Sequence, residues 1–145
     1  MNKKDLQNNI SIKTSIPAAA IGANGTKTGK VVDRKGNNGV QFIATYGAVT
    51  TTGSIVTLVF KEGDVTGTMT SIADSNLHGT EVLASLLATT PRTSGVSQNV
   101  VKRAGYIGNK RYVQTLAVQT GVTSVGVVNV NVLLFNPEQA PTLNP

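Results

Sequence analysis

The stretch VGVVNVNVLLF, Val125 to Phe135, alternates apolar and polar side chains with a period of two. Val128, Val130 and Val132 fall on one side of the chain, and the two asparagines between them fall on the other. Successive side chains of a β-strand point to opposite faces, so this alternation predicts a strand in a sheet with one buried face.

Other runs rich in β-branched and aromatic residues predict further strands. The strong runs are VQFIATY (Val40 to Tyr46), SIVTLVF (Ser54 to Phe60) and KRYVQTLAVQT (Lys110 to Thr120), and weaker ones lie at 9–16, 30–33, 67–72 and 98–104. Roughly eight short strands punctuated by Gly, Asn and Thr are typical of an all-β sandwich or jelly roll. We also expect GAVTTTG, residues 47–53, to join the first two strong runs as a hairpin.

One segment, TEVLASLLATT at residues 80–90, departs from the strand pattern. Its apolar residues recur at helical spacing: Val82, Leu83, Leu86 and Leu87. Thr80 could cap a helix and Pro91 could end it, so the segment predicts one short helix, with a strand as the alternative.

The length of 145 residues fits one domain. We expect an N-terminal arm at 1–16, a β-sandwich domain at 17–135 and an extended, proline-rich tail at 136–145. The chain has no cysteine, which excludes a disulfide framework, a thiolate metal site and thiol catalysis. No apolar run follows the basic N-terminus or approaches the length of a membrane span, so we expect neither a signal peptide nor a membrane contact.

The net charge is +6, although only 14% of the residues are charged, against about a quarter in an ordinary soluble domain. The basic residues gather in two groups. The first lies in the opening quarter of the chain, and the second consists of Lys102, Arg103, Lys110 and Arg111. Either group could face an acidic partner.

Motifs for chemistry are weak. The stretch GANGTKTGK, residues 22–30, resembles a phosphate-binding loop, but Asn24 replaces a required glycine and Val31 stands where Ser or Thr should bind magnesium. His78, the single histidine, follows Asp74 by four residues and is interpreted as a loop histidine. Glu62 and Asp64 are interpreted as solvated residues of a hairpin turn. We therefore expect no catalytic residue, cofactor or metal, and no enzyme.

Two classes of binding module remain as alternatives. The positive charge would favour nucleic acid, but only 4% of the residues are aromatic, whereas single-strand binding sheets combine a basic groove with several stacking aromatics. Direct nucleic-acid binding is therefore disfavoured. A β-sandwich module for glycans is disfavoured as well, because such sites stack sugars on exposed aromatics and the chain has no Trp.

The C-terminal third carries a resemblance to a known family. A turn GYIG at residues 105–108, a basic strand from Lys110 to Val113, a turn at Gly121, a long apolar strand and Pro141 follow one another. With VVDRKGNNGVQFIATYGAVTTTGSIVTLVFKEGD upstream, this pattern resembles the small capsid decoration, or cement, proteins of tailed double-stranded DNA bacteriophages. The resemblance carries over no catalytic residue.

The resemblance implies a jelly-roll or β-sandwich protein of the virion, assembled in the host cytoplasm, that binds the major capsid protein as a homo-oligomer (dimer or trimer) and stabilises the phage head. A coat, head-tail joining or tail protein is the alternative within the virion. On this basis Tyr106, Lys110, Arg111 and Tyr112 form the candidate partner interface. The two tyrosines would anchor the turn, and the two cations would meet acidic capsid loops. Alternatively, the cations only prevent wrong pairing at a sheet edge.

Overall fold

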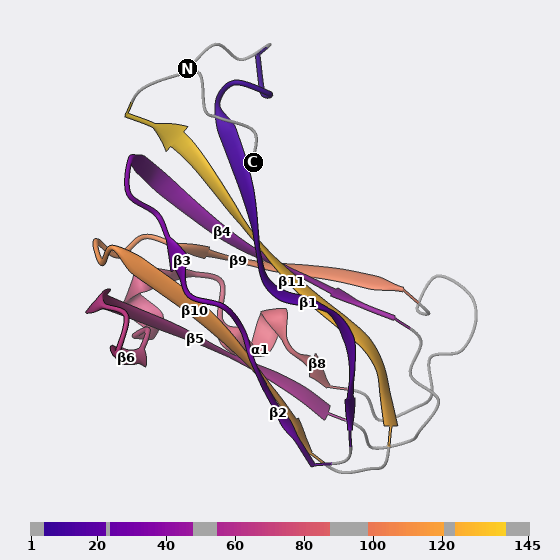
Figure 1. The fold of residues 1–145 in the computed structure, drawn as a ribbon. Helices are drawn as coiled ribbons and strands as arrows, with labels where there is room; N and C mark the ends of the chain where they lie inside the picture. The colour runs from indigo at the N-terminus through magenta and orange to yellow at the C-terminus, as the bar shows by residue number, and fades with distance from the viewer. Residues whose placement is uncertain (1–4, 23, 48–54, 88–98, 121–123, 139–145) are drawn as a thin grey trace.

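The structure, a computed structural model, describes residues 5–22, 24–47, 55–87, 99–120 and 124–138. Two antiparallel sheets form a β-sandwich (Figure 1). Sheet A contains, in spatial order, β1 (Ile10–Gly22), β11 (Ser124–Pro137), β4 (Asn37–Tyr46), β9 (Val100–Tyr106) and β7 (Leu77–His78). Sheet B contains β2 (Thr26–Thr28), β10 (Tyr112–Thr120), β5 (Ile55–Val65) and β6 (Thr68–Ser71), with β3 (Val32–Asp33) paired to β10 and β8 (Leu86–Leu87) paired to β5.

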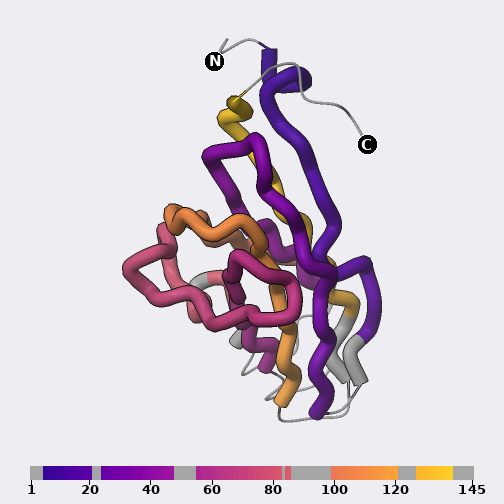
Figure 2. Tube along the Cα trace, turned by 60° about the vertical axis from the view of Figure 1, so that its left-hand side comes forward, coloured from indigo at the N-terminus to yellow at the C-terminus, as the bar shows by residue number. Residues whose placement is uncertain are grey.

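The strand order is that of a jelly roll. Along the chain the main strands pass back and forth between the sheets, so that β1, β4, β9 and β11 lie in sheet A and β2, β5, β6 and β10 lie in sheet B. Two antiparallel sheets wound in this way are the jelly-roll architecture, which confirms the predicted all-β sandwich. The first residues of β1 and the last of β11 pair with one another, from Ile10 with Phe135 onward, and project together at one end of the molecule (Figures 1 and 2).

The buried core lies between the sheets and follows the predicted alternation. Val128, Val130, Val132 and Leu134 of β11 are buried, while the asparagines between them are not. At the centre, Phe42 of sheet A stacks on Phe60 of sheet B, with ring centroids 4.2 Å apart. Removing these apolar surfaces from water supplies the main force that holds the two sheets together.

All the predicted strands are present, but the predicted hairpin is wrong. β4 pairs with β11 and β9 in sheet A, whereas β5 pairs with β10 and β6 in sheet B, so β4 and β5 do not form a hairpin; residues 48–53 between them lie outside the described residues. Two short strands, β2 and β7, were not predicted, and a third, β8, lies in segment 80–90, where a strand was the alternative to the helix. Each is only two or three residues long, which is too short for an alternation pattern to show.

The predicted helix at 80–90 is present only as α1, Glu81–Ala84, and the chain then enters β8. Two of its side chains serve sheet B instead of a helical core. The Ser85 hydroxyl accepts the Leu58 N–H at 2.8 Å, and the Glu81 carboxyl accepts the Phe60 N–H at 2.8 Å. α1 and the residue after it, Ser85, therefore satisfy backbone donors of β5 where no neighbouring strand does so.

The ends of the chain differ in part from the predicted arms. Residues 10–16, assigned to an N-terminal arm, belong to β1 and pair with β11. At the other end β11 continues through Pro137, and the Glu138 N–H donates to the Gly36 carbonyl at 2.8 Å. Residues 139–145, in the predicted tail, lie outside the described residues. In the described part of the chain, no helix is long and apolar enough to span a membrane.

Candidate functional site

Tyr106 anchors the turn between β9 and β10, as the sequence predicted. Its ring is buried, its hydroxyl donates to the Glu62 carboxyl, and its oxygen accepts the Lys110 N–H at 3.0 Å. Gly108 sits against it, because a Cβ at that position would lie 2.5 Å from the Tyr106 hydroxyl oxygen. The Arg34 guanidinium donates to the Gly108 carbonyl at 2.8 Å and lies over the Tyr106 ring. The turn is therefore fixed from inside the fold.

Glu62 is not the solvated turn residue that was predicted. It is buried, and besides the Tyr106 hydroxyl it lies 3.5 Å from the Asn76 side-chain nitrogen, which donates to it. The signal was present in the sequence, since the inward alternation of Leu58 and Phe60 continues to residue 62. Because Glu62 is polar and lies close to a turn, its inward position was not recognised from the sequence. Asp64, by contrast, is exposed as predicted.

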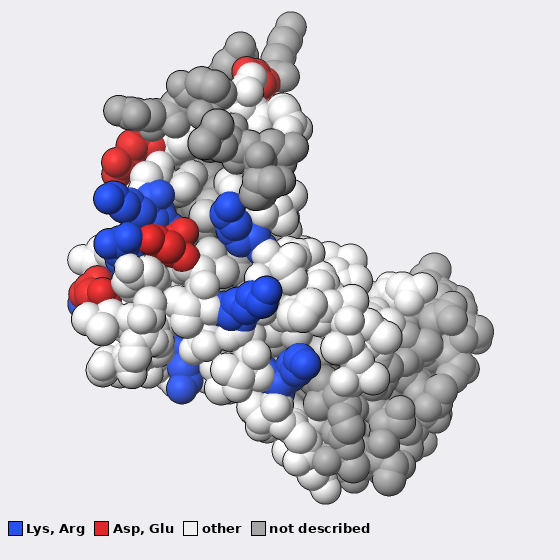
Figure 3. Space-filling view, viewed as in Figure 1, with Lys and Arg blue, Asp and Glu red and all other residues white. Residues whose placement is uncertain are grey.

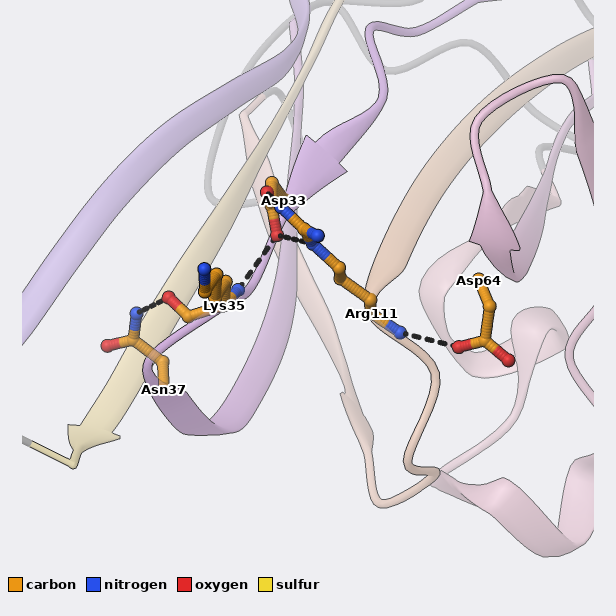
Figure 4. A network of polar contacts seen from close by, with 5 residues as sticks. All are labelled: Asp33, Lys35, Asn37, Asp64 and Arg111. Atoms are coloured by element: carbon orange, nitrogen blue, oxygen red, sulfur yellow. Dashed lines mark hydrogen bonds and ion pairs between the residues drawn. The ribbon is translucent and has the colours of Figure 1, made fainter.

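The two cations of the candidate interface are paired within the chain, and Figure 4 shows Arg111 beside Asp33 and Asp64. The Lys110 ammonium lies 2.6 Å from an Asp64 carboxylate oxygen, and the Arg111 guanidinium lies 2.6 Å from Asp33. Arg111 also donates through its Nε to both Asp33 oxygens, at 3.1 and 3.2 Å, and covers the Tyr112 ring. These hydrogen bonds lower the pKa values of Asp33 and Asp64 and raise those of Lys110 and Arg111.

The candidate interface is thus a clamp across three strands and not a free cationic patch. It ties the start of β10 to β3 and to the hairpin of β5 and β6, because Asp33 ends β3 and Asp64 lies near the end of β5. The side chains are well exposed, and exposed ion pairs of this kind contribute little stability. The two ion pairs do neutralise the local charge, since a carboxylate lies beside each cation.

A second basic surface carries positive charge without such partners. Figure 3 shows Lys and Arg side chains along the face formed by β1 and β2, while the Asp and Glu side chains in this view gather toward one edge and one end. We call this surface the lysine face and define it by Lys13 of β1, Lys27 of β2, and Lys30, whose N–H donates to the Ser15 carbonyl of β1. In the described part of the chain, no carboxylate lies within 4 Å of these three ammonium groups.

The structure also places the remaining predicted sites. His78, interpreted from the sequence as a loop histidine, lies instead in β7 and pairs with Gly105, and Asp74 begins the short 3-10 helix η1 (Asp74–Asn76). The glycine-containing stretch 22–30 holds β2, and Gly29 is buried in it. Among the described residues, no three His, Asp or Glu side chains lie close enough together to hold a metal ion.

Alkaline unfolding tests the tyrosine anchors. Burial raises the pKa values of Tyr46 and Tyr106, and the Glu62 hydrogen bond adds to the shift at Tyr106. The unfolded chain therefore releases these phenolic protons first, above about pH 10. We expect the free energy of unfolding to fall there by about 1.4 kcal/mol per pH unit for each tyrosine. Denaturant titrations at pH 8 to 11.5 measure it, and Tyr46→Phe should flatten the slope; an unchanged slope in that variant would contradict the prediction.

Comparisons with known proteins bear on the fold. No known protein-family profile matches the sequence, and no curated protein matches it. Among solved structures, the chain is similar to the SPBc2 prophage-derived protein YomS, with 14% identity, a TM-score of 0.51, and coverage of 88% of this chain and 94% of that one. It is also similar to the PBSX exported protein XepA, with 14% identity, a TM-score of 0.54, and coverage of 92% of this chain and 40% of that one. The chain thus spans less than half of XepA. Such identities show a shared fold.

Proposed function

We propose that this protein is a structural component of a phage virion that decorates the head by binding the major capsid protein as a homo-oligomer. The observation that carries the proposal is the lysine face, a surface of three ammonium groups with no carboxylate of the described residues within 4 Å. Such a surface is suited to acidic loops of a partner, because it requires no internal ion pair to be broken on binding. The fold shared with the prophage-derived protein YomS, and the resemblance of the C-terminal third to decoration proteins, support the same function.

The surface that meets the capsid protein is then the lysine face, and not the pair Lys110 and Arg111. Their carboxylate partners would have to be displaced before a capsid loop could bind either cation, and that exchange gains little. The lysine face lies on the edge strands β1 and β2 of the two sheets, where a neighbouring protein can approach both at once. Tyr106 and Tyr112 then act by holding the turn in place.

Co-sedimentation with expanded, undecorated phage heads at two salt concentrations tests the proposal. We expect saturable binding at a fixed copy number per capsid protein, weaker at the higher salt concentration because exposed charges are screened. The triple variant Lys13→Gln, Lys27→Gln, Lys30→Gln should bind at least about tenfold more weakly. Sedimentation of the free protein gives its oligomeric state.

The matched control is Lys110→Ala with Arg111→Ala, which also removes cations but leaves the lysine face intact. We expect its occupancy to stay close to that of the unmodified protein. Equal losses in both variants would refute a contact specific to the lysine face. If the folded, unmodified protein does not bind heads at all, decoration is refuted and a coat, joining or tail role takes its place.

A further inference from the structure

A groove of about 840 Å³ lies on the outer face of sheet A, away from the lysine face. The pair Gln41 and Gly105 joins β4 to β9, and the pair Gly105 and His78 joins β9 to β7. Partners in register point to the same face of a sheet, so Gln41 and His78 flank Gly105 on one row. Arg103, two residues from Gly105 on β9, projects from the same face.

Glycine keeps the floor of this groove open. Gly39 pairs with Phe135 across β4 and β11, and the Phe135 ring occupies the space that a Cβ at residue 39 would need. The half-buried Phe135 ring therefore packs over Gly39 on the surface of the sheet and presents an apolar surface to the groove. At Gly105 a Cβ would come within 3.1 Å of the His78 Cβ, so a larger residue there would push the imidazole aside.

The polar side chains of the groove have unused hydrogen-bonding capacity. In the described part of the chain, the side chains of Gln41, His78 and Arg103 make no hydrogen bond or ion pair with other residues. An amide, an imidazole and a guanidinium together supply planar donors around an aromatic ring. Among the described residues that line the groove there is no Asp or Glu, so its charge is positive through Arg103.

We propose that this groove binds an acidic saccharide, a sugar chain that carries carboxylate or phosphate groups. The Phe135 ring would pack against the apolar face of a sugar ring, and Gln41 and His78 would form hydrogen bonds with its hydroxyl groups. The Arg103 guanidinium would bind the anionic group. The volume is in the range of ordinary ligand sites, about 300–1,000 Å³.

An acidic peptide is the competing occupant, and the topology disfavours it. Peptides that add to a sheet need a free strand edge for main-chain hydrogen bonds. Beside the groove, the edge of β9 at Gly105 and Tyr106 is already paired with β7, and β7, the terminal strand of sheet A, is only two residues long, too short to bind an extended peptide backbone. Recognition here must therefore come from side chains, which suits a saccharide better than an extended backbone. The inference does not depend on capsid binding.

Titration of the purified full chain, followed by amide chemical shifts and calorimetry, tests the proposal. The probes are tetragalacturonate, a short poly(glycerol phosphate), uncharged cellotetraose and a tetraglutamate peptide. We expect the galacturonate or the glycerol phosphate to shift the amides of Gln41, His78 and Gly105, the first if the acid is a carboxylate and the second if it is a phosphate. Cellotetraose should bind at least tenfold more weakly, and the peptide should not bind the groove.

Two variants and one control make the result specific. Arg103→Gln and Phe135→Ala should each weaken the acidic saccharide at least tenfold while the folded amide spectrum is kept. Lys61→Gln removes one positive charge from sheet B and should leave the affinity unchanged. Binding that falls equally in all three variants, tighter binding of the peptide, or no amide shift with any saccharide at millimolar concentration would overturn the proposal. None of these results depends on phage heads, so failure here is distinct from failure of decoration.

Discussion

Replacing Phe60 by Ala should lower the free energy of unfolding by about 3–5 kcal/mol, as is typical for a fully buried phenylalanine. Phe60 is wholly buried in β5, and its ring stacks on Phe42 of β4 at 4.2 Å with an interplanar angle of 11°. The pair is the central contact between sheet A and sheet B, so the substitution opens a cavity between layers that each remain hydrogen-bonded. Denaturant unfolding followed by circular dichroism measures the loss.

A double-mutant cycle separates the stack from simple burial. Phe42→Ala and Phe60→Ala should not be additive, because their rings share one contact, and the coupling energy should be about 0.5–1.5 kcal/mol. Phe135→Ala is the matched control. Its ring is half-buried on the outer face of sheet A, so we expect a loss of about 1 kcal/mol or less. A Phe60→Ala variant no less stable than Phe135→Ala would show that the inter-sheet stack is unimportant.

The same stack shows how far the sequence could predict the fold. The sequence pattern identified β11 by its alternation, and β4, β5 and β10 by their β-branched and aromatic residues. It could not indicate that the two phenylalanines belong to different sheets. Alternation reports which side of a strand is buried, but not which strand lies beside it. The hairpin predicted between β4 and β5 was wrong for this reason, because these two successive strands lie in opposite sheets.

Only the local part of the candidate site could be predicted from the sequence, because its other contacts join residues that are far apart in the chain. The turn residues Tyr106 and Gly108 were found, since a glycine-containing turn before a strand is visible in the sequence. The ion pairs of Lys110 and Arg111 were not, because Asp64 and Asp33 lie 46 and 78 residues away in the chain. The groove on sheet A has no sequence signature either, since its lining comes from four strands, β4, β9, β7 and β11, that are far apart in the chain.

Gly29 connects the two sheets at the edge opposite that groove. Its N–H donates to the Thr115 carbonyl of β10 at 2.8 Å, and the next residue, Lys30, donates to the Ser15 carbonyl of β1 at 2.8 Å. The Ser15 hydroxyl returns a hydrogen bond to the Lys30 carbonyl at 3.1 Å. The chain between β2 and β3 therefore lies in contact with sheet A and sheet B at once, and Gly29 is buried at the point of contact.

We expect Gly29→Ala to destabilise the fold by about 3 kcal/mol, the upper end of the usual range for overpacking. The added Cβ would lie 2.6 Å from the Thr115 carbonyl oxygen, a backbone atom that cannot rotate away, and would also meet the Ser15 hydroxyl and the Ile16 side chain. Gly67→Ala is the control, because a Cβ there meets no atom within 4 Å and its φ is not left-handed; it should be neutral or stabilising by up to about 1 kcal/mol. Thermal unfolding of both variants measures the difference. Equal midpoints would mean that the strand edges at β1 and β10 can separate without cost, and the lysine face, which spans the same edge, would then lack the fixed geometry that specific binding needs.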